Sequence, residues 1–157
     1  MTKFSEKFMK HTIELSIKSV GNSGGPFGCV IVKNNKIISE GHNQVTSTND
    51  PTAHGEIVAI RNACKVLKTF NLKGTELYTS CEPCPMCLSA IYWSHIDMIF
   101  YGNTRQDASD IGFDDNFIYE EFNKEYKSRK IPIIQKMEKE AMKAFTMWDN
   151  KTDKIEY

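Results

Sequence analysis

The sequence lacks any excess of charge of one sign, because 20 Lys and Arg residues balance 20 Asp and Glu residues. Proteins that bind a polynucleotide or an anionic membrane usually carry a basic face, so the composition favours a small neutral ligand over nucleic acid or a membrane. The chain also has no run of 18 apolar residues, and its N-terminus has no signal-peptide core. We therefore expect a cytoplasmic protein.

Cysteine is scarce, odd in number and unevenly spread: the chain has five, and three of them fall within residues 81–87. This pattern suits a reducing compartment and a bound metal better than a disulfide framework. Internal repeats and low-complexity segments are absent as well. A length of 157 residues is enough for one core and leaves little for a second, so we expect a single domain over residues 1–157.

The cysteine cluster immediately precedes a helical pattern. If Pro83 is the first helical residue, Cys84 and Cys87 lie three positions apart on one helix face, where both thiols can reach one ion. The partial positive charge at a helix N-terminus favours the thiolate form that a metal ligand needs. Thirty residues upstream, His54 opens another helical pattern. One histidine with two cysteines is a ligand set of catalytic zinc sites, which keep a fourth position for water.

Four other interpretations of the cysteines remain open, each less favoured. An iron–sulfur cluster would need a fourth cysteine, and none follows Cys87. A redox-active Cys-x-x-Cys pair in a thioredoxin-like unit is a second alternative. A closed structural zinc site joined by Cys29 or Cys64 is a third, and cysteines that merely pack in the core are a fourth. We interpret Cys81 as a structural neighbour of the metal ligands.

Glu56, two residues after His54, is a candidate general acid/base. Residues two apart on a regular helix point in roughly opposite directions, so the spacing alone does not place the two side chains in one pocket. Only the geometry of a helix end could bring them together.

The order His-x-Glu and then Pro-Cys-x-x-Cys is a signature of zinc deaminases, and the chain resembles the cytidine deaminase-like superfamily. Within that superfamily it is similar to the bacterial guanine deaminases in residues 24–28, 49–67, 78–94, 112–121 and 156–157. The resemblance implies a zinc-dependent hydrolase that converts guanine to xanthine and ammonia. Two alternatives stay open: a deaminase of cytosine or of adenosine in tRNA, and a non-catalytic, zinc-stapled module that binds nucleobases.

The same resemblance implies roles for particular residues. One zinc ion per chain, with a bound water or hydroxide, would be held by His54, Cys84 and Cys87. Glu56 would transfer protons as general acid and base, and Asp115 would assist at the amino group of the substrate.

The resemblance also implies how the base is held. Phe27 and Asn43 would bind the purine together with Asp115, and the terminal Tyr157 would cover the site. In the enzymes that the chain resembles, the C-terminal segment crosses to a second subunit, so a homodimer with a domain swap is expected. Without the resemblance, we would interpret Asp115 as a loop or cap residue, Asn43 as a turn former and Phe27 as a core aromatic.

Hydrophobic periodicity and turn residues predict an α/β fold with a five-stranded mixed sheet. The order of the predicted elements implies helices on both faces of the sheet, and the superfamily that the chain resembles has this three-layer α/β/α architecture. On the helix after His54, we expect the buried stripe to be Ile57, Ile60, Cys64 and Leu67. The predicted strands span residues 27–33, 36–40, 75–80, 96–101 and 131–137, and the predicted helices span residues 4–20, 54–67, 84–94, 117–123 and 138–150.

Overall fold

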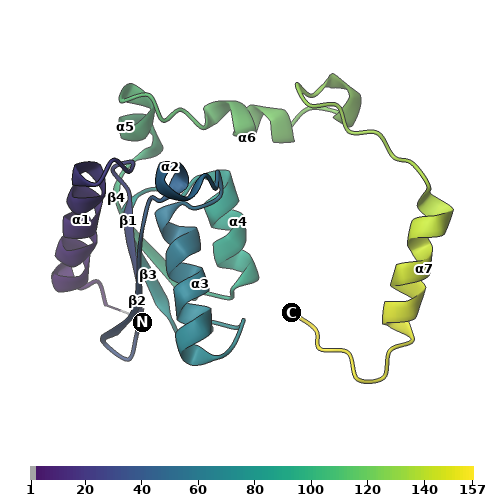
Figure 1. The fold of residues 1–157 in the computed structure, drawn as a ribbon, viewed down its shortest axis with the longest axis horizontal. Helices are drawn as coiled ribbons and strands as arrows, with labels where there is room; N and C mark the ends of the chain where they lie inside the picture. The colour runs from purple at the N-terminus through teal and green to yellow at the C-terminus, as the bar shows by residue number, and fades with distance from the viewer. Residues whose placement is uncertain (1–2) are drawn as a thin grey trace. The chain divides into compact units, whose positions relative to one another are not determined.

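The computed structural model describes residues 3–157, which divide into two compact units, one that ends at Asp115 and one that begins at Asn116. The first unit contains a β-sheet with helices on both sides, and the second contains helices and turns (Figure 1). In the described part of the chain, no helix is long and apolar enough to cross a membrane.

The sheet of the first unit has four strands in the order β2-β1-β3-β4. β1 pairs antiparallel with β2 and with β3, whereas β3 and β4 are parallel and are joined by helix α4. Asn34 and Asn35, with φ of 50° and 59°, form the turn between the first two strands. The strands are β1 (Gly28–Lys33), β2 (Lys36–His42), β3 (Glu76–Cys81) and β4 (Met98–Asn103).

Alternation along the strands directs side chains to two separate cores. On one face, the buried cluster includes Cys29, Ile31 and Leu77, with residues of α3 (Gly55–Leu67) and α4 (Pro85–Trp93). On the other face, Val30, Val32 and Tyr78 pack with residues of α1 (Glu6–Gly21). The first unit therefore confirms the predicted three-layer α/β/α sandwich (Figure 1).

Helix α3 lies closer to the sheet than its pattern of large apolar residues suggests. Ile57, Ile60, Cys64 and Leu67, which were predicted to be buried, are only partly buried, while Ala59 and Ala63 are fully buried. Gly41 of β2 allows this close approach, because a Cβ there would collide with the carbonyl oxygen of Gly55. Small residues thus set the distance between α3 and the sheet.

The Gly41 contact predicts a stability effect. Gly41→Ala should lower the free energy of unfolding by about 2 kcal/mol, because the added methyl group meets backbone that cannot move without shifting α3. Gly21→Ala is the matched control, since a Cβ at Gly21 meets nothing within 4 Å. Denaturant unfolding of both variants tests the prediction, and equal stabilities would show that α3 can move at little cost.

The predicted fifth strand, residues 131–137, is wrong: this segment has no secondary structure. Pro132 has no N–H to donate to a sheet, and the N–H of Ile133 donates instead to the carbonyl of Tyr126 at 3.4 Å. A strand also requires a neighbouring strand, which an apolar run in a sequence does not reveal. Ile131 and Ile134 are correspondingly exposed.

Two short helices lie outside the predicted helices and strands. Helix α2 (Val45–Thr48) is a single turn, and α5 (Arg105–Asp110) begins with a capping box. In that box the N–H of Asp107 donates to the hydroxyl of Thr104, and the carboxylate of Asp107 accepts from the backbone N–H of Thr104. The Thr-x-x-Asp spacing was a signal for this helix in the sequence.

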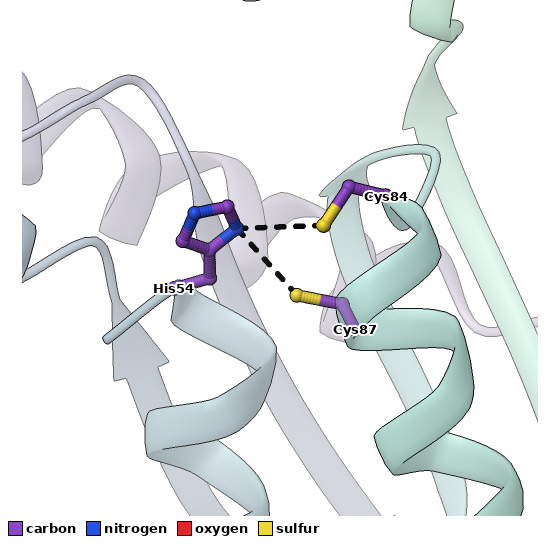
Figure 2. Close-up of side chains that lie close together, drawn as sticks. All are labelled: His54, Cys84 and Cys87. Atoms are coloured by element: carbon purple, nitrogen blue, oxygen red, sulfur yellow. Dashed lines mark hydrogen bonds between the residues drawn. The ribbon is translucent and has the colours of Figure 1, made fainter. Parts of the chain in front are cut away.

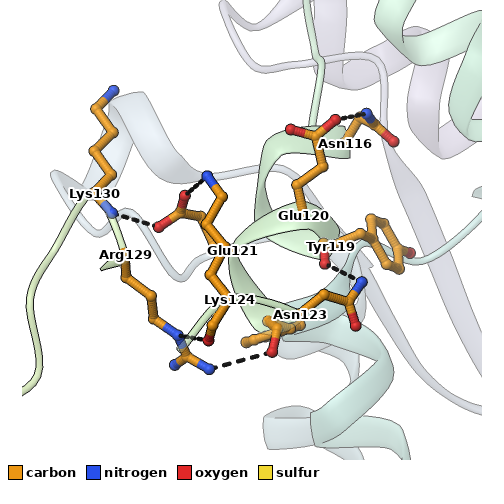
Figure 3. A network of polar contacts seen from close by, with 9 residues as sticks. Asn116, Tyr119, Glu120, Glu121, Asn123, Lys124, Arg129 and Lys130 are labelled. Carbon is orange, nitrogen blue, oxygen red and sulfur yellow. Dashed lines mark hydrogen bonds and ion pairs between the residues drawn. The ribbon is translucent and has the colours of Figure 1, made fainter. Parts of the chain in front are cut away.

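The second unit contains helices α6 (Asn116–Phe122) and α7 (Glu138–Asp149) and a 3-10 turn, η1 (Tyr126–Ser128). Local polar contacts hold residues 116–130 together (Figure 3). The Glu121 carboxylate accepts from the Lys124 ammonium and from the backbone N–H of Lys130, both at 2.6 Å. No residue from 116 to 157 is buried, so this unit has no hydrophobic core of its own.

Candidate metal centre

The two helices that carry the sequence motif begin with their proposed metal ligands. His54 is the N-cap of α3, with φ −69° and ψ 157°, and Cys84 is the N-cap of α4, with φ −64° and ψ 167°. Pro85, rather than the predicted Pro83, is the first residue of α4, where a missing N–H removes no helical hydrogen bond. The extended backbone of both caps directs His54 and Cys84 toward the space between the helix N-termini.

His54, Cys84 and Cys87 converge on one point (Figure 2). The Nδ1 atom of His54 lies 3.6 Å from the Sγ of Cys84 and 3.6 Å from the Sγ of Cys87. For tetrahedral zinc, with Zn–S about 2.3 Å and Zn–N about 2.0–2.1 Å, the expected N···S separation is about 3.6 Å. The three side chains therefore fit a zinc ion and leave its fourth coordination position to a ligand from outside the chain.

The electrostatics of the cluster favour a charged sulfur. Hydrogen bonds from Cys87 and His54 lower the pKa of the Cys84 thiol to about 4, against the opposing effect of burial. The hydrogen bond with Cys84 in turn raises the pKa of His54, and zinc would compete with that proton because imidazole binds a metal in its neutral form. A thiolate at Cys84 is the form in which cysteine binds a metal.

The remaining cysteines lie outside this cluster. In the described part of the chain, the only group of three metal-binding side chains found within reach of one ion is His54, Cys84 and Cys87. Cys29 is fully buried in the core, and Cys64 packs against that core from α3. Cys81 is buried with its Sγ 3.6 Å from the carbonyl oxygen of Thr104, and burial raises its pKa to about 11. A closed site that uses Cys29 or Cys64 is not formed.

Glu56 is buried beside the cluster, with 5% of its surface exposed. The N-cap conformation of His54 explains how two residues at i and i+2 share a pocket, because only Glu56 belongs to the regular helix. The hydroxyl of Thr79 donates a hydrogen bond to Oε1 of Glu56 at 2.9 Å, and burial raises the pKa of the Glu56 carboxyl. We did not predict a role for Thr79 from the sequence. The available signal was a polar residue on the same strand face as Leu77 and Cys81, both of which are buried.

Phe27 and Asn43 are held next to the start of α3. The N–H of Asn43 donates to the carbonyl of Phe27 at 3.0 Å, and that carbonyl lies 3.3 Å from the position of a Cβ on Gly55. The Phe27 ring packs edge-on against Phe113, with centroids 4.9 Å apart. This contact brings the run of residues 112–115 toward the Phe27 side of the sandwich.

The two remaining predicted residues, Asp115 and Tyr157, belong to different units of the structure. Asp115 is half-buried, and both its burial and the charge of Cys84 raise its pKa, which places this carboxyl within electrostatic reach of the metal cluster. Tyr157 belongs to the second unit and is 73% exposed, so its role stays a prediction.

Comparison with known proteins identifies relatives along the whole chain. Residues 2–103 match the family model of the cytidine and deoxycytidylate deaminase zinc-binding region. A guanine deaminase of Bacillus subtilis is 50% identical over 97% of this chain and 98% of its own length. A tRNA-specific adenosine deaminase of Aquifex aeolicus is 41% identical over 61% of this chain and 64% of its own.

A solved structure agrees with the sequence match. The X-ray structure of guanine deaminase from Bacillus subtilis is 49% identical, covers 99% of both chains and superimposes with a TM-score of 0.95. The motif, the geometry of its side chains and these matches lead to one conclusion. The chain belongs to the cytidine and deoxycytidylate deaminase family of zinc-dependent enzymes.

Proposed function

We propose that the chain catalyses the hydrolytic deamination of guanine to xanthine and ammonia. The observation that carries this proposal is the cluster of His54, Cys84 and Cys87, which fits a zinc ion with one coordination position left open. The buried carboxylate of Glu56 lies beside this cluster. The relative that matches over nearly the full length is a guanine deaminase. The matched region of the tRNA-specific adenosine deaminase covers only 61% of this chain.

The reaction needs a nucleophile and two proton transfers. Zinc held by His54, Cys84 and Cys87 would lower the pKa of a bound water to about 7 and so make it nucleophilic at neutral pH. Glu56 takes a proton from that water and returns it to the ring nitrogen next to the reacting carbon. The oxygen adds to C2 as the C2=N3 double bond becomes single. Glu56 then moves the second proton from that oxygen to the exocyclic nitrogen, so that C2=O forms, the bond from C2 to the exocyclic nitrogen breaks and ammonia leaves.

Three side chains are proposed to hold the base. Asn43 is 8% exposed, and its Oδ1 accepts hydrogen bonds from the backbone N–H groups of Gly25 at 3.3 Å and Val45 at 3.4 Å. Because these donors can pair only with the oxygen, the amide nitrogen is the end that donates to an acceptor atom of the purine. Phe27 stacks on the ring, and Asp115 accepts from the amino group that leaves.

We propose that the active form is a homodimer in which the C-terminal segment of one chain covers the zinc site of the other. The second unit has no buried residue, and it exposes large apolar side chains such as Phe145, at 70%, and Met147, at 74%. In the first unit, β4 is at an edge of the sheet and exposes Met98 and Tyr101. Unpaired strand edges and apolar surface favour association, and exchange of identical segments is a low-cost route to a dimer.

The chemistry of the site also favours a location and a substrate size. Cysteine ligands remain available to zinc where thiols stay reduced, so we place the enzyme in the cytoplasm. The chain has no net charge, which suits a free base better than a polynucleotide. The small-molecule base, rather than nucleic acid, is therefore the proposed partner.

A substrate panel tests the proposed activity. Ammonia release should be faster with guanine than with adenine, cytosine or a tRNA anticodon stem-loop by a factor of about 10² or more, because a site built to pair with one base edge leaves polar groups unpaired with another. Omission of the protein and of the base gives the background. A faster rate with cytosine or tRNA adenosine would reassign the substrate, and zinc-loaded protein without turnover would favour the nucleobase-binding module.

A further inference from the structure

We propose that Thr79 is a positioning residue, which holds the Glu56 carboxylate in the orientation that proton transfer requires. This inference rests on the proposed acid/base role of Glu56. Nothing in the zinc-binding motif requires a hydroxyl at this position, since Thr79 precedes the first cysteine of the cluster and is not a metal ligand. Its side chain instead faces the carboxylate that the reaction would use.

The hydrogen-bond distances assign the hydroxyl proton to Glu56. Oγ1 of Thr79 lies 2.9 Å from Oε1 of Glu56 and 3.5 Å from the carbonyl oxygen of Gly28. A hydroxyl has one proton, and the shorter contact to a carboxylate is the stronger one. Thr79 is 1% exposed and Glu56 is 5% exposed, so little solvent competes for this bond.

The donor belongs to a rigid part of the fold. Thr79 is in β3, between β1 and β4, where it pairs with Cys29 on one side and with Tyr101 on the other. Threonine is branched at Cβ, which restricts its first side-chain torsion. Glu56 is in the first turn of α3, so this hydrogen bond connects the side chain of the helix to the sheet beneath it.

Glu56 needs such a connection because its side chain has several rotatable bonds. A general acid/base must stay within hydrogen-bonding distance of the atoms whose protons it moves, and small displacements reduce the rate strongly. A hydrogen bond to Oε1 limits rotation of the carboxylate. Thr79 therefore supplies orientation, and it does not touch the substrate or transfer a proton itself.

Two substitutions separate the hydroxyl from the shape of the side chain. Thr79→Val keeps the branched shape and loses the donor, and it should lower kcat for guanine roughly 10- to 100-fold with KM and zinc content close to wild type. Thr79→Ser keeps the donor and should retain most of the activity. Thr79→Ala is a second variant without the donor, in case the valine variant does not fold.

A double substitution tests whether the effect passes through Glu56. In a Glu56→Gln background, Thr79→Val should reduce the remaining rate less than about twofold, because the group that it positions is already impaired. An equal loss in both backgrounds would overturn the inference. The inference would also be overturned if Thr79→Ser lost as much activity as Thr79→Val, or if kcat of Thr79→Val stayed within about threefold of wild type. Loss of zinc from the variants, or failure of both donor-free variants to fold, would overturn it as well.

Crystal structures of the zinc-loaded wild type and Thr79→Val provide a readout that does not depend on turnover. The Glu56 carboxylate should move by about 1 Å or occupy more than one rotamer in the variant. An unchanged Glu56 conformation would overturn the inference. If wild-type protein deaminates no base in the panel, the proposed function fails, and this structural comparison still decides the role of Thr79.

Discussion

Replacement of Glu56 by Gln is expected to lower kcat for guanine roughly 10²- to 10⁴-fold while about one zinc ion per chain stays bound. Glutamine has nearly the same shape and can still accept the hydrogen bond from Thr79, which lies 2.9 Å from Oε1 in the structure. It cannot take a proton from water and return it to the base. The His54, Cys84 and Cys87 cluster does not include Glu56, so zinc should remain.

Steady-state kinetics with metal analysis on the same preparations measures both parts of this expectation. Glu125→Gln is a matched control, because the side chain of Glu125 is 77% exposed and belongs to the second unit. Turnover of Glu56→Gln near that of wild type would remove Glu56 from the proton transfers. Loss of zinc from the variant would show instead that the buried carboxylate supports the metal site.

Deletion of residues 151–157 is expected to lower kcat/KM for guanine roughly 10²-fold or more with little change in zinc content. In the proposed dimer, this segment excludes water from the base and keeps it against the reacting groups. The deleted residues contribute no metal ligand and no buried side chain. Tyr157→Phe is the conservative control, because it retains an aromatic ring to cover the site.

Complementation distinguishes a swapped segment from one that folds onto its own chain. A mixture of truncated chains with Glu56→Gln chains should recover activity, because a hybrid dimer combines the intact site of one chain with the intact C-terminus of the other. Neither chain is expected to be active alone. A segment that covers its own site would give no recovery, and an unchanged kcat/KM after deletion would show that residues 151–157 are a dispensable terminus.

The sequence determined the metal site more completely than the outline of the fold. Metal binding requires particular atoms, and His54, Cys84 and Cys87 are recognisable because few side chains supply nitrogen or sulfur ligands at that spacing. The helices and strands around them followed from hydrophobic periodicity. The apolar run 131–137 had the same kind of pattern and failed, because a strand depends on a partner that the sequence does not specify.

Only the tertiary structure decided how the chemical groups meet. Helical spacing alone did not place His54 and Glu56 in one pocket, and the extended N-cap conformation of His54 supplies the helix-end geometry that brings them together. The contact between Glu56 and Thr79 joins residues 23 positions apart, through the packing of α3 on the sheet. Periodicity reports which face of an element is apolar, but the distance of closest approach depends on small residues such as Gly41. Ligand identity is thus encoded locally, whereas orientation and burial arise from packing between distant segments.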